Sequence, residues 1–250
     1  MVSDGEAAQR ATTAEEHGHS PKEVARRLEA GRRQSHLKDM VYGAIDGAVT
    51  TFAIVAGVAG AGLSPKVILA LGAANILADG FSMAAGNYAG TKAEVDDRAR
   101  IIAIEKTHIQ RNPEGEREEL RQILQRRGLS DDVLEAAVEA IAADRDKWID
   151  LMLTDEYGLA GTAPDPMRAA LATFGAFMLA GAVPLVPFIF GIGDAFTISA
   201  AATLLTFFLI GTVKSVWSLS AWWRSGIETL LIGGTAALLA YAVGGLFHEG

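Results

Sequence analysis

The sequence predicts an all-α integral membrane protein, with five transmembrane helices and a helical cytoplasmic domain inserted between the second and the third. Two observations predict this fold class. Half of the 250 residues are apolar, and the charged residues are concentrated in two segments, 1–39 and 91–168. The remaining segments contain apolar runs of about 20 residues, which is the length that an α-helix needs to cross the hydrocarbon core of a bilayer.

Five apolar runs divide the chain into its predicted elements. The predicted spans are residues 40–62, 66–90, 167–191, 194–217 and 226–247. The second span contains polar residues but is otherwise rich in Ala, Leu and Ile, as expected of a helix packed inside a bundle. The predicted organisation is an N-terminal tail and lead-in (1–39), helices one and two (40–90), an inserted domain (91–166) and helices three to five (167–250).

Glycines and prolines add detail to three of these helices. Gly43-x-x-x-Gly47 in the first span and Gly86-x-x-x-Gly90 in the second allow close approach of helix backbones. We therefore expect the first two spans to form a tight pair. The third span ends in Pro-Leu-Val-Pro (184–187), whose missing amide hydrogens should kink its outer end.

Basic residues predict the orientation of the chain in the membrane. Of the 22 Lys and Arg residues, seven precede the first span and eleven lie in residues 91–166. Because cytoplasmic flanks collect Lys and Arg, we expect both segments in the cytoplasm and the C-terminus on the opposite side. The first thirty residues contain no apolar run typical of a signal peptide. In a bacterium the protein would be located in the cell membrane.

The inserted domain is acidic, with 18 Asp or Glu residues against 11 Lys or Arg. Breaks at 112–113, 128–130 and 158–166 predict three or four helices. The chain contains no cysteine, so a metal would be held by carboxylate, imidazole, thioether or carbonyl groups. Such ligands favour Fe²⁺, Mn²⁺ and similar divalent ions over Cu(I).

Two pairs of side chains in the inserted domain form a candidate metal site. Glu105 and His108 are three residues apart on one predicted helix, and Glu116 and Glu119 are three apart on the next. Each pair therefore shares a helix face. If the turn at 112–115 brings the two faces together, four oxygen or nitrogen donors converge on one place, which is enough for a divalent cation. The alternative is a solvated charged surface, because acidic helices often contain such pairs by chance.

Carboxylates inside the apolar spans form a second candidate site, because an ionised side chain in hydrocarbon costs at least a few kcal/mol. Asp46 and Met83 lie roughly 9 and 11 Å from the cytoplasmic ends of spans one and two. We therefore expect the two side chains to meet at one depth. Asp79 lies one turn deeper.

Polar residues continue from this site along both helices. Thr50 follows Asp46 by one turn on span one, and the series on span two is Asn75, Asp79, Met83 and Asn87. This stripe predicts a hydrated pathway for a cation, in which a desolvated carboxylate can exchange metal for a proton. The alternative is that Asp46 and Asp79 are satisfied by neighbouring Thr, Asn, Ser or backbone groups and only fix helix packing.

Three motifs carry a resemblance to a known family. They are Asp46-Gly-Ala-Val-Thr50, Ala78-Asp-Gly-Phe-Ser-Met-Ala84 followed by Gly86-Asn-Tyr88, and Pro113-Glu-Gly-Glu-Arg-Glu-Glu-Leu120. Together with the five spans, they resemble the vacuolar iron transporter family over residues 36–247. The resemblance implies a dimeric Fe²⁺/H⁺ antiporter that removes iron from the cytoplasm for iron homeostasis and detoxification. Mn²⁺, Zn²⁺ and Co²⁺ are further candidate cargo.

The resemblance also implies roles for individual residues. Asp46 and Met83 would line the transport site. The metal-binding residues of the inserted domain would be Glu105, Glu116, Glu119, Met152 and Glu156. His108 stands where the family pattern predicts a glutamate, and imidazole is still a competent ligand for Fe²⁺, Mn²⁺ or Zn²⁺. The family further implies that span two continues past Gly90 as one helix.

Two other functions are compatible with the sequence. Glu105-x-x-His108 is the spacing used by di-iron carboxylate oxidases, although no second pair of this kind occurs in the spans or the inserted domain. A membrane adaptor that transports nothing would use Asp46 and Asp79 only for packing. We expect instead a transporter that is not an enzyme and holds no tightly bound cofactor. Its partners would be divalent metal ions, protons, the lipid bilayer and a second copy of the chain, and not nucleic acid.

Overall fold

The computed structural model describes residues 19–30, 35–218 and 220–246, and every regular element in these ranges is helical. Much of the predicted N-terminal tail, and residue 247 at the end of the fifth predicted span, lie outside the described residues. The chain divides into two compact units. We call Met1–Ala89 with Pro166–Gly250 the membrane unit, and Gly90–Asp165 the inserted unit.

Five helices in the described part of the chain are long and apolar enough to cross a membrane. They are α3 (Leu37–Gly60), α4 (Pro65–Arg111), α8 with its continuation (Pro166–Ile189), α10 (Ala195–Lys214) and α11 (Trp222–Gly245). The predicted fold class, all-α with five membrane spans, is therefore confirmed. The expectation that span two continues beyond Gly90 is also confirmed, because α4 is a single helix of 47 residues. A short helix, α2 (Pro21–Ala30), precedes the spans.

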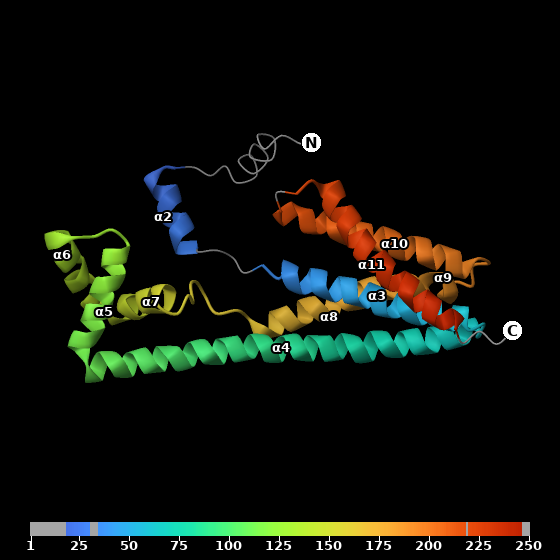
Figure 1. Ribbon diagram of the computed structural model, residues 1–250, viewed down its shortest axis with the longest axis horizontal. Helices are drawn as coiled ribbons and strands as arrows, with labels where there is room; N and C mark the ends of the chain where they lie inside the picture. The colour runs from blue at the N-terminus through green and yellow to red at the C-terminus, as the bar shows by residue number, and fades with distance from the viewer. Residues whose placement is uncertain (1–18, 31–34, 219, 247–250) are drawn as a thin grey trace. The chain divides into compact units, whose positions relative to one another are not determined.

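The central helix of the membrane unit is α3, which packs against α8, α10 and α11 (Figure 1). Two glycines on α3 face α8. A Cβ atom added to Gly43 would lie 2.4 Å from the carbonyl oxygen of Thr173, and one added to Gly47 would lie 2.4 Å from that of Phe177. The first glycine motif therefore does permit close backbone contact, but with α8.

The second glycine motif has no equivalent contact. A Cβ atom added to Gly86 or Gly90 would meet no neighbouring atom within 4 Å. α4 contacts α8 elsewhere, at Gly80, where an added Cβ atom would lie 3.1 Å from the ring of Phe177. The predicted tight pair of spans one and two is therefore wrong, and α8 takes the place beside α3.

The double-proline sequence interrupts the third span as predicted. α8 (Pro166–Ala182) passes into a 3₁₀ turn, η1 (Val183–Leu185), and then into the short helix α9 (Val186–Ile189). Proline has no amide hydrogen to continue the helical hydrogen bonds. The Oγ of Ser199 on α10 donates a hydrogen bond to the carbonyl of Pro184 at 2.7 Å. The kink is thereby joined to the next span.

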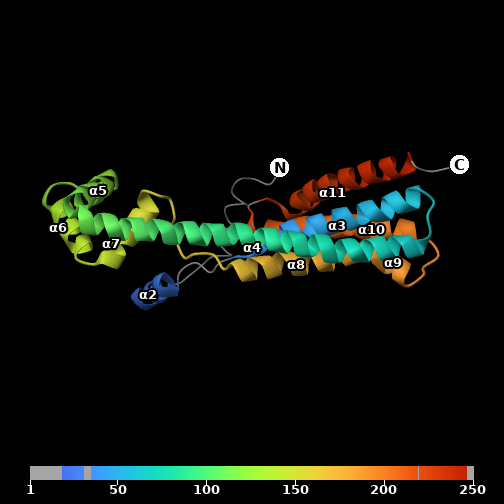
Figure 2. The same cartoon turned by 90° about the horizontal axis from the view of Figure 1, so that it is seen from below.

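The inserted unit contains the end of α4 together with α5 (Pro113–Arg126), α6 (Asp131–Ala142) and α7 (Arg145–Asp155). Figure 2 shows these three helices grouped around the C-terminal end of α4. This agrees with the three or four helices expected from the sequence. The buried core of the unit includes Leu120, Leu124, Val138, Trp148 and Met152.

A capped turn sets the position of α5 against α4. Asn112 follows the last residue of α4, and its Oδ1 accepts a hydrogen bond from the amide of Gly115 at 3.3 Å. Pro113 occupies the first turn of α5, where its missing amide hydrogen costs no helical hydrogen bond. The chain therefore reverses direction at Asn112, and one face of α5 is turned towards α4.

Candidate functional site

The first candidate site lies in the inserted unit, where α4 and α5 meet. The Nδ1 atom of His108 lies 3.5 Å from Oε1 of Glu116 and 3.9 Å from Oε1 of Glu105. One ligand atom from each of the three side chains lies within 4.8 Å of the others. The structure thus brings together three of the four residues that the helix spacing singled out. We call these three residues the inserted-unit cluster.

Both carboxylates of this cluster are buried. Glu105 is 1% exposed and Glu116 is 6% exposed. The Oε2 atom of each has no hydrogen-bond partner among the described residues. Two buried carboxylates need either protons or a cation to offset the cost of burial and their mutual repulsion. Carboxylate oxygens and one imidazole suit Fe²⁺, Mn²⁺, Co²⁺ or Zn²⁺, and the two unpartnered oxygens fit such an ion as their missing partner.

Two exposed carboxylates contribute to the electrostatics of the cluster. Burial raises the pKa of Glu116 to about 7, and the negative charges of Glu119 and Glu105 act in the same direction. Burial also raises the pKa of Glu156, again with help from Glu105 and Glu119. Glu119 and Glu156 are themselves exposed. They therefore lie at the open edge of the cluster.

Met152 lies in a different environment. Its side chain is fully buried and packs in the core of the inserted unit with Leu120, Leu124 and Trp148. This location agrees with core packing, which is what the sequence indicates for Met152 when it is considered alone. Its role as a thioether ligand stays a prediction from the family.

Tyr157 is a member of this site that the sequence analysis missed. Its hydroxyl group donates a hydrogen bond to Oε1 of Glu105 at 2.9 Å, across 52 residues of sequence. Burial and the neighbouring carboxylates raise the pKa of Tyr157, so the phenol keeps its proton and acts as a donor. No motif marks this residue, because it lies in the turn after α7 rather than on a patterned helix.

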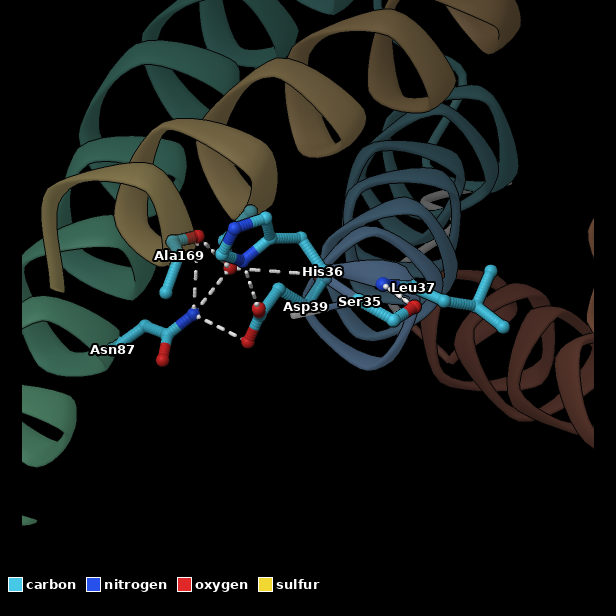
Figure 3. A network of polar contacts seen from close by, with 7 residues as sticks. Ser35, His36, Leu37, Asp39, Asn87 and Ala169 are labelled. Atoms are coloured by element: carbon cyan, nitrogen blue, oxygen red, sulfur yellow. Dashed lines mark hydrogen bonds and ion pairs between the residues drawn. The ribbon is translucent and has the colours of Figure 1, made fainter. Parts of the chain in front are cut away.

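The second candidate site lies between α3 and α4 in the membrane unit. Two side-chain hydrogen bonds join these helices. Nδ2 of Asn87 donates to Oδ1 of Asp39 at 2.9 Å (Figure 3), and Nδ2 of Asn75 donates to Oγ1 of Thr50 at 3.2 Å. The two bonds are 11 residues apart on α3 and 12 apart on α4. Because both helices rise by 1.5 Å per residue, the bonds fix a nearly constant antiparallel register.

This register determines the depth of the charged groups. We take the bond between Asn87 and Asp39 as the reference level and count residues along both helices from it. Asp46 then lies at the same depth as Asp79 to within about 1.5 Å, and Met83 lies at the same depth as Gly43. The expected depth match of Asp46 with Met83 is therefore displaced by about one helical turn. Asp46 and Met83 are partly buried and Asp79 is exposed, and the two carboxylates interact electrostatically.

Asn87 lies in a polar network that connects three helices. Besides its bond to Asp39, Nδ2 of Asn87 lies 2.7 Å from Oγ1 of Thr173 and 3.2 Å from the carbonyl oxygen of Ala169, both on α8. The other carboxylate oxygen of Asp39 lies 3.3 Å from Nδ1 of His36 (Figure 3). Asn87 therefore contributes to the packing of α3, α4 and α8.

Asp39 was not singled out as a site residue in the sequence analysis. The sequence predicts that Asp39 lies in the lead-in before the first span, whereas α3 already begins at Leu37. A helix start three residues earlier places Asp39 on α3, seven residues from Asp46. That spacing is about two helical turns, so both carboxylates lie on similar sides of the helix.

Comparisons with known proteins cover both units. The model of the VIT family matches residues 37–245. The chain is 31% identical to vacuolar iron transporter 1 of Eucalyptus grandis over 241 residues, which span 92% of this chain and 96% of that protein. It is 33% identical to vacuolar iron transporter 1 of Arabidopsis thaliana over 212 residues, 83% of this chain and 84% of the relative. A vacuolar iron transporter of Toxoplasma gondii is 32% identical over 225 residues, 85% of this chain and 74% of the relative. These relatives are named as transporters, in agreement with the expectation that the chain is not an enzyme.

Proposed function

Because the chain belongs to the VIT family and is a multi-pass membrane transporter of metal ions, we propose that it exports Fe²⁺ from the cytoplasm in exchange for protons. The relatives named as iron transporters support Fe²⁺ as the cargo. Mn²⁺, Zn²⁺ and Co²⁺ are further proposed cargo, since carboxylate and imidazole ligands bind all four ions.

The observation that carries the proposal is the inserted-unit cluster, with its two buried carboxylate oxygens that lack partners. In the proposed mechanism the inserted unit faces the cytoplasm and captures the ion there. The exposed carboxylates of Glu119 and Glu156 attract the cation to the edge of the cluster. Metal binding requires deprotonated carboxylates and a neutral imidazole, so capture is favoured at neutral rather than acidic pH.

Asp46 and Asp79 form the proposed site within the membrane. Two carboxylates at one level of a bilayer cannot both stay ionised without a compensating positive charge. Either a proton or a cation supplies that charge, which couples the entry of an ion to the release of a proton. Met83 on α4 lies level with Gly43, about one turn from the carboxylates towards the N-terminal end of α3. Thr50 lies one turn from Asp46 towards the C-terminal end of α3. These two residues would extend the path on either side of the carboxylates.

A second copy of the chain is proposed to cover the open side of this path. Asp79 is exposed on α4, as is Ser82, which lies three residues further along the same face of the helix. A carboxylate that faces lipid is costly. The same surface of a partner, related by a two-fold axis, would cover Asp79 and enclose the ion between two copies.

The deciding experiment is Fe²⁺ uptake into proteoliposomes with an imposed pH gradient. We expect Asp46→Asn to lower the initial rate by about 10-fold or more, as for loss of a group close to the metal. Asp194→Asn is the matched control, because this exposed carboxylate lies just before α10. Unchanged flux in Asp46→Asn would reject the site, and flux without proton movement would reject the coupling. A wild-type protein without any metal flux would favour the adaptor function.

A further inference from the structure

The turn that follows α7 is held on both α7 and α4 through Leu159. The amide of Leu159 donates to the carbonyl of Leu153 at 2.7 Å, which closes the turn on α7. Nη1 of Arg98 on α4 then donates to the carbonyl of Leu159 at 2.6 Å. The side chain of Leu159 packs on the small apolar cluster that contains Ile101 and Leu153. We call residues 156–159 the strap.

The bond between Arg98 and Leu159 places the strap beside the inserted-unit cluster. Arg98 and Glu105 are seven residues apart on α4, or about two helical turns, so they share a face of the helix. Holding Leu159 at Arg98 therefore places the preceding residues of the strap alongside Glu105. Tyr157 makes its 2.9 Å hydrogen bond to Glu105 from this position. The neighbouring Glu156 is close enough for its charge to act on Glu116.

The hydrogen bond from Tyr157 constrains the buried carboxylate of Glu105. Glu105 is 1% exposed, Oε1 accepts the bond from Tyr157, and Oε2 has no partner among the described residues. Groups that hydrogen-bond to a metal ligand orient it, and their loss typically weakens metal binding by about 10- to 100-fold. A constrained carboxylate also discriminates between ions, because Ca²⁺ prefers 6–8 oxygen ligands in a flexible arrangement.

We propose that Tyr157 is a positioning residue of the inserted-unit cluster, and that the strap assembles the site by holding both Tyr157 and the candidate ligand Glu156 against α4. This inference rests on the proposed function, because it requires the cluster to bind a divalent metal ion. It assigns Tyr157 to the orientation of Glu105 and to selection against large cations. It gives Arg98, which donates to the carbonyl of Leu159, the role of holding the strap closed.

The test uses the purified full-length protein and calorimetric titration with Zn²⁺ and with Ca²⁺. Tyr157→Phe removes one hydroxyl group and leaves the ring. We expect Zn²⁺ binding to weaken by about 10- to 100-fold while Ca²⁺ binding changes less, so that the preference for Zn²⁺ falls. The visible absorption of bound Co²⁺, which reports the geometry of its ligands, should change as well. Tyr42→Phe is the matched control, because Tyr42 is 70% exposed in the membrane unit.

Two further variants separate positioning from general destabilisation. Arg98→Gln should weaken Zn²⁺ binding in the same direction, and its effect should not add fully to that of Tyr157→Phe, because both act through the strap. In a Glu105→Ala background, Tyr157→Phe should have no further effect on Zn²⁺ affinity, since the carboxylate that it positions is absent.

The outcomes distinguish this inference from the proposed function. A wild-type protein that binds no Zn²⁺, Co²⁺ or Fe²⁺ at the cluster would overturn the proposed capture site, and the inference with it. If the wild type binds metal and Tyr157→Phe matches it in affinity, in Zn²⁺ preference and in Co²⁺ spectrum, the positioning role is overturned and the capture site stands. An equal loss with and without Glu105 would also overturn the positioning role.

Discussion

Metal-free protein should lose local stability in the inserted unit as the pH rises from 5 to 8. The pKa of Glu116 is raised from its usual 4.5 to about 7, first by burial and then by the charges of Glu119 and Glu105. A carboxyl group with a raised pKa keeps its proton better in the folded than in the unfolded chain. Its contribution to stability is therefore present below pH 4.5 and is lost as the pH rises through about 7.

The size of the effect follows from the two pKa values of Glu116. Each pKa unit corresponds to 1.36 kcal/mol, so the change from 4.5 to about 7 corresponds to about 3 kcal/mol in total. About 2 to 3 kcal/mol of this is lost between pH 5 and pH 8. The population of the locally opened inserted unit should then increase by roughly 30- to 100-fold.

Hydrogen exchange of the α5 amides, corrected for the intrinsic effect of pH, measures this opening directly. Glu116→Gln should abolish the pH dependence and stabilise the metal-free protein at pH 8. Glu118→Gln is the matched control on the same helix, because hydrogen bonds from Gln122 and Arg121 lower the pKa of Glu118 instead. With Zn²⁺ bound, the dependence should reverse, since protons compete with the metal.

The reasoning is refuted if Glu116→Gln and the wild type show the same pH dependence of α5 exchange. It is also refuted if exchange in the metal-free wild type is flat between pH 5 and pH 8 after correction. Either result would mean that Glu116 is already ionised and compensated at neutral pH. The cluster would then not need a cation to balance its buried charge.

Other variants test the helix contacts and the metal preference. Gly43→Ala adds a methyl group 2.4 Å from a carbonyl oxygen of α8 and should destabilise the protein by about 1–3 kcal/mol, lowering its thermal unfolding temperature in detergent, whereas Gly86→Ala has open space and should not. Asn87→Leu removes the amide that joins three helices and deprives Asp39 of a donor, which should cost about 1–3 kcal/mol and slow Fe²⁺ uptake. His108→Glu replaces imidazole by a harder carboxylate ligand, and competition binding should show a shift in preference from Zn²⁺ towards Mn²⁺.

The spans and the kink could be predicted because their causes are local. An apolar run of sufficient length forms a membrane helix wherever it packs, and the two prolines at 184 and 187 interrupt a helix whatever its neighbours. The partner of a glycine motif is not a local property. Gly43 and Gly47 indicated a close helix contact but could not indicate α8, which begins more than a hundred residues later.

The depth of Asp46 shows a second limit. Its predicted match with Met83 depended on where each span was taken to begin and end, and composition defines those ends only to within a turn. Two hydrogen bonds, from Asn87 to Asp39 and from Asn75 to Thr50, define the register instead. They also bring Asp79 level with Asp46, so the pairing of these carboxylates at one depth, on which the proposed proton coupling rests, became evident only from the structure.

The inserted-unit cluster depends both on local sequence signals and on contacts between segments that are far apart in the sequence. Its donor atoms come from neighbouring helices joined by the turn at Asn112, so the spacing within the pairs Glu105/His108 and Glu116/Glu119 predicted that two helix faces could meet there, with a solvated charged surface as the alternative. Tyr157 comes from a turn 52 residues away and is placed by the contact of Arg98 with Leu159. The three ligands of the cluster are therefore encoded locally, whereas the orientation of Glu105 depends on a long-range contact. It follows that substitutions at Glu105, His108 or Glu116 should mainly change which ions bind. Substitutions in the strap should leave these ligands in place and reduce their preference for Zn²⁺ over Ca²⁺.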